Sequence, residues 1–452
     1  MNHMIFSLEK FEKRMAELEW RRYCELEPIT PMESMEATGC KDAPYTELPN
    51  EFISTDMQLG DFFVGRDRYL WLRKKLVLPK AIAGYKVTGL FDFGVTGGGG
   101  NSGFESLLYV NGKPYQGVDS NHQDVVLQEF AGQEAELTFL LWTGLEGGGK
   151  KKTFYHQMLK AHVGYLHEAA DKFYYYLKAV CQELQYLTET DGNKYILTDA
   201  MEEALKLVNW DEDKLHATIV DALELFEKRI DASGWKSPVT VNCIGHTHID
   251  VAWLWRLKHT REKSMRSFAT ALRLMKEYDE FVFLQTQPQL YQYLKHDCPE
   301  LYEEIKQRVK DGKWEAEGGM WLEADCNITS GESLVRQMLY GTEFFRKEFG
   351  VECRYLWLPD VFGYSWALPQ ILKQCNIKTF MTTKISWNQF NSIPNDLFTW
   401  RGIDGSEILT YFVDTPEENQ DFSDRFSTYN GMLNPRAIIG NWTKFKNKDI
   451  SN

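Results

Sequence analysis

Between Pro238 and Asp414, short apolar runs alternate with amphipathic stretches, and this alternation constrains the fold more than any other feature. The apolar runs that are typical of buried strands are "VTVNCIG", "FVFLQT", "KWEAEGGMW", "CRYLWLPD", "KTFMTTK" and "EILTYFV". Between them, "REKSMRSFATALRLMKEY" and "SGESLVRQMLYGTEFFRKEFG" are predicted to be helices. Because strands that alternate with helices usually lie parallel, the region is predicted to form a parallel α/β barrel or sheet.

The upstream sequence predicts two other structural classes. Residues 5–26 have apolar positions at helical spacing, which indicates an amphipathic helix. From Pro44 to Thr143, short alternating runs predict an all-β sandwich, and "YVNGKPY" predicts a hairpin because Asn-Gly suits a turn with positive φ. Residues 153–235 are predicted to be helical, because apolar residues recur there at helical spacing: Tyr155, Leu159, Val163 and Leu166.

The length of 452 residues is too great for one ordinary core, so several domains are expected. The predicted fold class is multidomain, with an N-terminal all-β sandwich, a helical connector and an α/β catalytic domain. The predicted boundaries are 1–43 for a helix and linker, 44–150 for the sandwich, 151–236 for the connector, 237–415 for the catalytic domain and 416–452 for the start of a downstream segment.

Charge and cysteine usage exclude some partners and compartments. The formal net charge is −14 and no long basic stretch occurs, which argues against nucleic-acid binding. The cysteines are scattered without a CxxC pair, which is typical of a reduced, intracellular protein. The N-terminus lacks the apolar core of a signal peptide, and no apolar run approaches membrane-spanning length. We therefore predict a cytoplasmic protein with neither nucleic-acid nor membrane partners.

Two glycine-rich stretches imitate nucleotide-binding motifs without the required context. Gly98, Gly100 and Gly103 fit GxGxxG, but a strand and hairpin follow instead of a helix. "GLEGGGKK" has Lys151 where a phosphate loop has a magnesium-binding Ser or Thr. Both stretches are interpreted as loops.

The segment "VNCIGHTHIDVAWLW" carries His246, His248 and Asp250 on alternate positions at the end of an apolar run. Side chains alternate along a strand, so the three residues can share one face, and the carboxyl ends of barrel strands carry active sites. Imidazole and carboxylate groups together suit zinc, but a polar strand edge with ordinary hydrogen bonds remains the alternative. Zinc would need a further ligand from elsewhere in the chain.

The best candidate for that ligand is Asp360, which follows the apolar run in "YLWLPDVFGYS". Its carboxylate would converge with Asp250 if both strands join one barrel, whereas the alternative role is a cap on the following turn. Glu323 and Asp325 in "GGMWLEADCNITSGESLVRQ" lie two positions apart and can both face the barrel mouth. Loop or capping roles are the alternative, since acidic residues stabilise helix starts.

The run "TTKISWNQFN" ends another strand with Lys384, Trp387 and Asn388. A cation, an aromatic ring and an amide at one rim suit a polyhydroxylated ligand. A packed loop is the alternative interpretation.

Together, "GHTHIDVAWLW", "GGMWLEADCNITSGESLVRQ" and "LWLPDVFGYS" resemble the catalytic domain of glycoside hydrolase family 38, the zinc-dependent α-mannosidases. "LLYVNGKPYQGVDSNHQDVVL" and "TTKISWNQFN" are similar to the cytosolic and bacterial branch. The resemblance spans most of the chain from the β-region to about residue 415, with several long motifs in the family's order.

The resemblance implies a (β/α)7 barrel preceded by a β-sandwich and a helical segment. It implies one Zn²⁺ per catalytic domain with ligands from His248, Asp250 and Asp360, and it makes His246 a neighbour. Asp360 would also be the nucleophile of a retaining exo-α-mannosidase that hydrolyses terminal α-D-mannosides in mannose-containing oligosaccharides. The aromatic positions that line the family's sugar subsite map to Trp253 and Phe362.

The family's fourth zinc ligand, a histidine, and its acid/base aspartate belong to motifs that are not found before Asn452. We therefore expect the chain alone to bind zinc poorly and to turn over slowly or not at all. The resemblance also implies self-association.

Two other functions stay open. A zinc-dependent sugar deacetylase on a related barrel would activate water and need no nucleophile at Asp360. A non-catalytic carbohydrate-binding fragment would bind sugar without zinc. Covalent labelling of Asp360 would distinguish the mannosidase from both.

Overall fold

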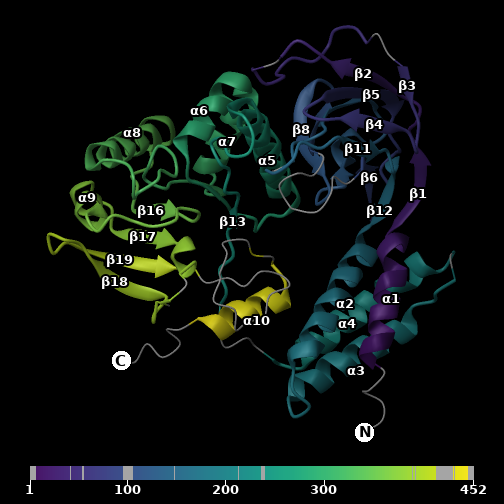
Figure 1. The fold of residues 1–452 in the computed structure, drawn as a ribbon. Helices are drawn as coiled ribbons and strands as arrows, with labels where there is room; N and C mark the ends of the chain where they lie inside the picture. Colours follow the sequence, from purple (N-terminus) through teal and green to yellow (C-terminus); the bar gives the residue numbers. More distant parts are fainter. Residues whose placement is uncertain are drawn as a thin grey trace. The chain divides into compact units, whose positions relative to one another are not determined.

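The computed structural model describes residues 7–40, 42–52, 55–94, 105–146, 148–211, 213–235, 240–388, 390–391, 393–413, 431 and 433–445. The glycine-rich stretch with Gly98, Gly100 and Gly103, and most of the predicted segment 416–452, lie outside these residues. The chain divides into two compact units (Figure 1): residues 1–39 with 49–241, and residues 40–48 with 242–452. Among the described residues, no helix is both long enough and apolar enough to cross a membrane.

The first unit contains most of the antiparallel strands and a group of helices. In chain order its elements are α1 (Ser7–Arg21), β1 (Tyr23–Pro28), β2 (Met32–Ala37), β3 (Thr55–Met57), β4 (Phe62–Gly65), β5 (Tyr69–Val77), β6 (Tyr85–Asp92), β7 (Glu105–Val110), β8 (Lys113–Asp119), β9 (Asp124–Val126), η1 (Gln128–Phe130), β10 (Glu134–Trp142), β11 (Phe154–Gln157), β12 (Lys160–His167), α2 (Glu168–Tyr186), α3 (Gly192–Leu207) and α4 (Leu215–Ala232).

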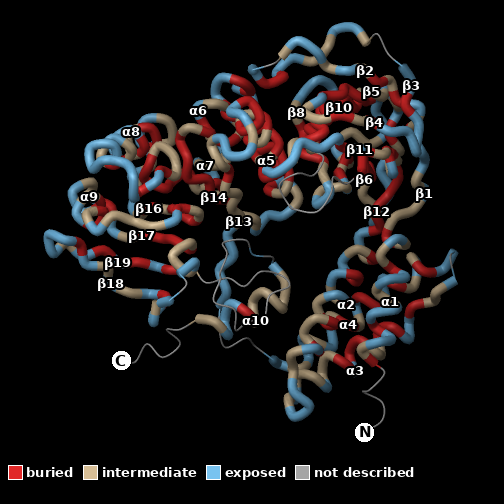
Figure 2. Tube along the Cα trace, viewed as in Figure 1, coloured by how far each residue is buried: buried red, intermediate tan, exposed pale blue. Residues whose placement is uncertain are grey.

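Two antiparallel sheets of this unit share one core. Their strand orders are β1-β12-β6-β9 and β3-β2-β5-β10-β7-β8, and β11 pairs with β4 in a smaller sheet. Buried side chains of both sheets, such as Phe91 and Phe139, belong to one apolar cluster, and the buried segments are red in Figure 2. The predicted hairpin is confirmed, because Asn111 has φ 51° and Gly112 has φ 81° between β7 and β8.

The prediction of helix from residue 153 onward is wrong for the first part of that range. Phe154–Gln157 and Lys160–His167 are strands β11 and β12, and β12 pairs with both β1 and β6. Tyr155, Leu159 and Val163 are spaced by four, which fits the helical period and the strand period of two equally well. The predicted linker before residue 44 is likewise wrong, since β1 and β2 join the two sheets.

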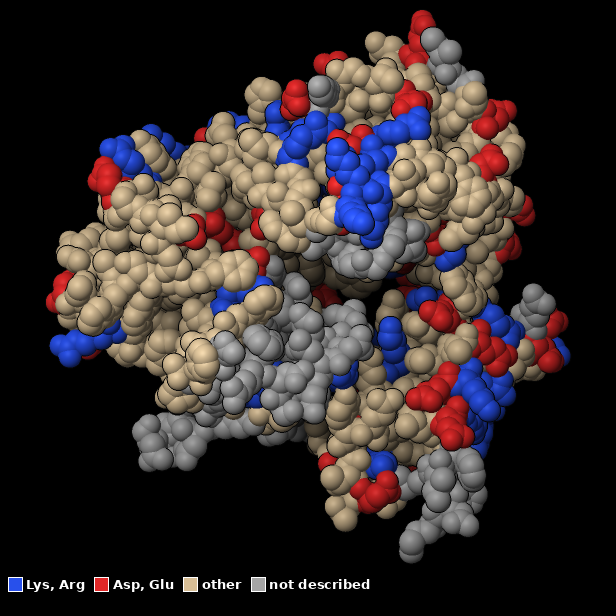
Figure 3. All heavy atoms as spheres, viewed as in Figure 1, with Lys and Arg blue, Asp and Glu red and all other residues tan. Residues whose placement is uncertain are grey.

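The helices α1 to α4 lie side by side and form their own core (Figure 1), to which Phe11, Phe173, Met201 and Phe226 contribute. The amphipathic helix predicted at residues 5–26 is confirmed as α1, which is shorter. Over these helices, acidic and basic side chains alternate on the face drawn in Figure 3, and several form ion pairs, including Lys172 with Glu227.

The second unit is a mixed α/β structure. Its elements are β13 (Gly245–His246), α5 (Leu257–Glu277), β14 (Phe283–Gln285), α6 (Pro288–Asp297), α7 (Pro299–Lys310), β15 (Trp314–Ala316), α8 (Gly331–Phe349), β16 (Tyr355–Leu358), α9 (Leu368–Gln374), β17 (Thr379–Thr382), η2 (Lys384–Ser386), β18 (Leu397–Arg401), β19 (Glu407–Phe412) and α10 (Pro435–Lys444). The residues before Asn242 that belong to this unit, Cys40–Leu48, contact α5: Lys258 Nζ donates to the Cys40 carbonyl at 3.0 Å.

The strands β13, β14 and β15 pair in parallel, as do β16, β17 and β19, with β18 antiparallel at the edge. The backbone N–H of Trp357 in β16 donates to the carbonyl of Gly318 just after β15, at 3.2 Å. The predicted alternation of strands and helices is confirmed. Within the described residues the strands form no closed barrel, so the seven-stranded barrel stays a prediction.

A close contact between α8 and the loop after β15 fixes the start of one site segment. Gly319 has φ 88°, which favours glycine. A Cβ atom added at Gly341 in α8 would overlap the carbonyl of Gly319 and the backbone of Met320. The missing side chain at Gly341 therefore allows the helix to approach this loop.

We predict that Gly341→Ala lowers the free energy of unfolding by about 1–3 kcal/mol, because backbone atoms must move to admit the methyl group. Gly331→Ala is the matched control: it lies in the same helix with nothing within 4 Å of an added Cβ. Urea unfolding of both variants measures the difference. A Gly341→Ala midpoint equal to or above that of the control would contradict the prediction.

His167 caps α2 from the end of β12. Its Nδ1 accepts the N–H of Ala170 at 3.1 Å, and its ring stacks on His216 with centroids 4.5 Å apart. Burial, together with the charge of His216, lowers the pKa of His167 to about 4. The cap therefore requires the neutral ring.

Acid should destabilise the first unit through His167. The unfolded ring has a pKa of about 6.5, so between pH 6.5 and pH 4 the unfolded chain binds the extra proton. The contribution of His167 to stability is full above pH 6.5 and falls as the pH falls toward 4. His167→Asn keeps a capping oxygen and removes the titration. Thermal unfolding from pH 7 to pH 5 should show a smaller loss in this variant, and an equal loss would refute the assignment.

Candidate metal centre

The segment that carries His248 and Asp250 follows β13 and is held in place by two buried glutamines. Gln285, in β14, donates from Nε2 to the Thr247 carbonyl at 3.0 Å. Gln287 does the same to the Ile249 carbonyl, also at 3.0 Å. These two amides hold the backbone on both sides of His248. The predicted strand "VTVNCIG" ends in β13, but its described residues before Gly245 are not strand.

Thr260, in the first turn of α5, holds the other end of this segment. Its Oγ1 donates to the Asp250 carbonyl at 3.0 Å and accepts from Ala252 N at 3.1 Å and from Trp255 Nε1 at 3.0 Å. Ala252 has φ 66°, a backbone conformation that costs free energy outside glycine. The hydrogen bonds to Thr260 stabilise that turn.

Three predicted ligands converge on one point. His248 Nε2 lies 3.3 Å from Asp250 Oδ1 and 3.4 Å from Asp360 Oδ2. One ligand atom from each of these residues lies within 4.8 Å of the others. Asp360 lies two residues after the end of β16, and His248 lies two residues after the end of β13. Two strand ends of the unit therefore meet here.

Two of the three distances among these atoms fit zinc. With bonds of about 2.0–2.1 Å, a tetrahedral zinc ion requires its ligand atoms to lie about 3.3 Å apart. The two distances from His248 Nε2, 3.3 and 3.4 Å, match this spacing. One imidazole and two carboxylates are also ligand types that zinc accepts.

The charges around His248 favour a cation. Burial by itself would lower the pKa of His248, but the neighbouring Glu323 and Asp250 outweigh it and raise the pKa to about 10. His248 Nδ1 lies 2.8 Å from Glu323 Oε2, and burial raises the pKa of that carboxyl group. Lys384 Nζ lies 2.9 Å from Asp360 Oδ1. Three carboxylates thus face one histidine and one lysine.

His246 has a different environment from His248. Its Nδ1 donates to the Leu284 carbonyl at 3.0 Å, and its Nε2 accepts from Trp357 Nε1 at 3.2 Å. Burial lowers the pKa of His246 to about 4. Both ring nitrogens are engaged, so His246 is a neighbour of the cluster and not one of its ligands.

An aromatic and cationic rim adjoins Asp360. Lys384 Nζ lies 4.2 Å from the ring centroid of Trp387 and 5.4 Å from that of Phe362. The two rings meet edge to face with centroids 6.1 Å apart. Phe362 is 64% exposed and Trp387 is 54% exposed, so both present exposed ring surface beside the cluster.

The other predicted residues have more local environments. Asp325 is exposed, and its Oδ1 accepts from Asn327 N and Ile328 N. Asn388 Oδ1 accepts from Phe390 N and Asn391 N. These contacts are those of the loop and capping roles that the sequence left open. Trp253 is exposed and contacts Trp255 edge to face at 5.4 Å.

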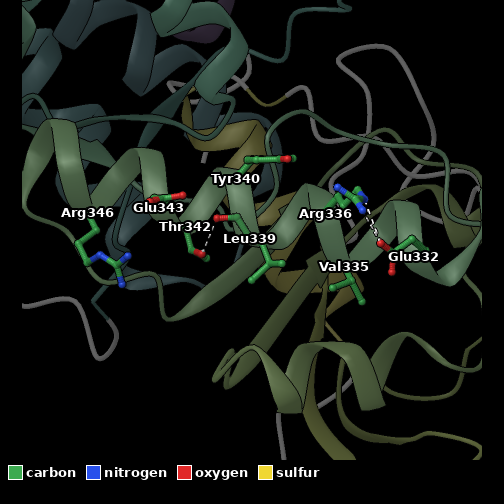
Figure 4. A pocket seen from close by; sticks show the side chains of 8 residues that line it. All are labelled: Glu332, Val335, Arg336, Leu339, Tyr340, Thr342, Glu343 and Arg346. Atoms are coloured by element: carbon green, nitrogen blue, oxygen red, sulfur yellow. Dashed lines mark hydrogen bonds and ion pairs between the residues drawn. The ribbon is translucent and has the colours of Figure 1, made fainter.

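A surface depression on α8 is separate from this cluster. Figure 4 shows its lining, which comes from that helix alone: Glu332, Val335, Arg336, Leu339, Tyr340, Thr342, Glu343 and Arg346. It contains none of the predicted site residues. The candidate metal centre is therefore defined by the proximity of possible ligand atoms and not by this depression.

Residues 238–452 match the glycosyl hydrolases family 38 N-terminal domain. This region contains every residue of the cluster. The chain belongs to glycosyl hydrolase family 38.

Two relatives match well beyond this domain, and a third matches a shorter part of the chain. Alpha-mannosidase G of Dictyostelium discoideum is 30% identical, over 100% of this chain and 41% of that protein. Alpha-mannosidase 2C1 of Mus musculus is 34% identical, over 82% of this chain and 36% of that protein. The alpha-mannosidase of Saccharomyces cerevisiae is 44% identical, over 37% of this chain and 16% of that protein.

A solved structure, an alpha-mannosidase from Enterococcus faecalis V583, is 23% identical with a TM-score of 0.34, over 37% of this chain and 19% of that chain. The chain thus spans less than half the length of the curated family 38 relatives that it matches.

The two histidines should differ in their effect on zinc binding. We predict that His248→Ala weakens zinc binding by about 100-fold or more, because a zinc ligand is lost. His246→Gln, which keeps a donor and an acceptor, should change it by less than about tenfold, as expected for a residue outside the ligand set. Competition with a chromophoric chelator at pH 7 measures both. Equal losses would remove the distinction drawn between them.

Proposed function

We propose that this chain provides the zinc centre and nucleophile of a retaining exo-α-mannosidase that hydrolyses terminal α-D-mannosides. The observation that carries the proposal is the meeting of His248, Asp250 and Asp360 at zinc-ligand spacing. Membership of family 38 and relatives that are named alpha-mannosidases support the choice of substrate.

Asp360 is the proposed nucleophile. A carboxylate oxygen of Asp360 attacks the anomeric carbon while the bond to the leaving oxygen breaks, and that oxygen takes a proton from the predicted downstream acid/base residue. Water then hydrolyses the glycosyl ester with retention and returns a proton to the same residue. Lys384, 2.9 Å from Oδ1, holds the carboxylate in one orientation. A zinc ion held by His248, Asp250 and Asp360 would bind sugar hydroxyls and stabilise developing charge.

The exposed rings beside Asp360 are the proposed sugar contacts. The faces of Phe362 and Trp387 lie next to the Lys384 ammonium group and offer apolar surface to a pyranose ring. Trp253 is proposed to contribute on the side of Asp250. Asn388 keeps its amide nitrogen for a hydroxyl group while its oxygen holds the loop.

Several features of the fold, the metal site, the location and the partners of this protein stay predictions. They are the seven-stranded barrel, the single zinc ion per catalytic domain, the downstream acid/base and fourth ligand, the cytoplasmic location, self-association, and the absence of nucleic-acid and membrane partners.

A fluorinated mannosyl fluoride tests the nucleophile directly. Fluoride leaves without a proton donor, so the ester should accumulate even where acid catalysis is weak. We predict a stoichiometric mass increase on the peptide that contains Asp360 and none in Asp360→Asn. Asp325→Asn, the matched control, keeps its loop-capping oxygen and should label like the wild type.

Labelling of a residue other than Asp360 would contradict the proposed nucleophile. The absence of labelling, together with release of acetate from acetylated sugars, would favour the deacetylase reaction. Sugar binding that survives chelation of zinc, without labelling, would favour a binding fragment.

A further inference from the structure

Glu323 is a buried carboxylate that the proposed reaction does not use. Its side chain is 5% exposed and lies against His248, whose side chain is 8% exposed. The Nδ1–Oε2 distance is 2.8 Å, which is the spacing of an ion pair. Among the described residues, neither side-chain oxygen of Glu323 has a hydrogen-bond partner, so His248 is its one close polar contact.

Burial of this charge is costly unless it is compensated. Removing an ionised carboxylate from water costs several kcal/mol, and His248 already has Asp250 and Asp360 as acidic neighbours that can compensate its charge. Stability alone therefore gives no reason for Glu323. The group that it contacts, the imidazole of His248, is the nitrogen ligand of the proposed metal centre.

The two ring nitrogens of His248 face different partners. Nδ1 points to Glu323, whereas Nε2 points to Asp250 and Asp360. A neutral imidazole carries one N–H and one lone pair, and a metal ligand must direct the lone pair at the ion. Which nitrogen carries the proton is set by the acceptor at the other nitrogen.

The side chain of Gln287 connects the backbone of Glu323 to the backbone next to His248. The Glu323 N–H donates to Gln287 Oε1 at 3.4 Å, and Gln287 Nε2 donates to the Ile249 carbonyl at 3.0 Å. Gln287 is 2% exposed, so both hydrogen bonds are shielded from water. The segment after β15 and the segment after β13 are thus joined through one amide.

We propose that Glu323 is a positioning residue of the metal centre: it accepts the Nδ1–H of His248 and directs the Nε2 lone pair at the ion. The inference rests on the proposed function, because it assigns a role toward the zinc site. Glu323 acts through His248 and touches neither the ion nor the sugar. Its charge also makes the imidazole a more basic ligand.

The test measures zinc affinity and the stability of the metal-free chain in parallel. Glu323→Gln keeps an oxygen acceptor and loses the charge, and Glu323→Leu loses both. Zinc affinity by chelator competition should fall about tenfold in the first and about a hundredfold in the second. The thermal midpoint of the metal-free form should change little, because His248 keeps Asp250 and Asp360 as acidic partners when Glu323 is lost. Glu332→Gln, an exposed change in the same region of the chain, is the matched control and should leave both quantities unchanged.

The outcomes separate this role from the metal centre itself. Unchanged affinity in both Glu323 variants, with loss in His248→Ala, would overturn the positioning role and leave the metal centre standing. A lower midpoint of the metal-free form without loss of affinity would assign Glu323 to the fold and also overturn the role. Equal zinc affinity of the wild type and His248→Ala would overturn the metal centre and the role of Glu323 together.

Discussion

The imidazole of His248 joins the segments of the site to one another. It lies between the buried carboxylate of Glu323 on one side and the carboxylates of Asp250 and Asp360 on the other. These groups come from the ends of different strands, and their like charges repel one another unless a cation lies between them. The arrangement of the strand ends therefore depends on how this surplus of negative charge is compensated.

The surrounding structure provides rigidity that the charged groups do not. Buried amides from β14 and the hydroxyl of Thr260 hold the main chain of the ligand segment, while the small residue Gly341 lets α8 pack against the loop that leads to Glu323. Hydrogen bonds and packing contacts of this kind, made by residues outside the ligand set, determine whether the ligand atoms meet within a few tenths of an ångström. The aromatic rim, in contrast, is exposed, as expected of a surface that receives a ligand.

The sequence predicts the strand ends because they depend on local pattern, whereas the proposed ligand set of His248, Asp250 and Asp360 comes from the resemblance. An apolar run followed by His248 or by Asp360 marks a strand end directly, and the resemblance selects among the nearby acids. The roles of Gln285, Gln287 and Thr260 were not predicted, because an amide or hydroxyl has no periodic signature and its partner lies on another segment. The spacing of four from Tyr155 to Val163 suits both the helical and the strand period, and only the pairing of β12 with β1 and β6 decides between them.

The assignment of Cys40–Leu48 to the second unit has a practical consequence for dissection of the chain. This short stretch is flanked by residues of the first unit, yet it supplies contacts to the start of α5: Asp42 pairs with Arg256 at 3.6 Å, and Tyr45 lies under Lys258 at 5.4 Å. A recombinant fragment that begins at Asn242 would lack these partners and expose the helix that anchors Thr260. The second unit is discontinuous in sequence, and any excision should graft the stretch back or retain everything that precedes it.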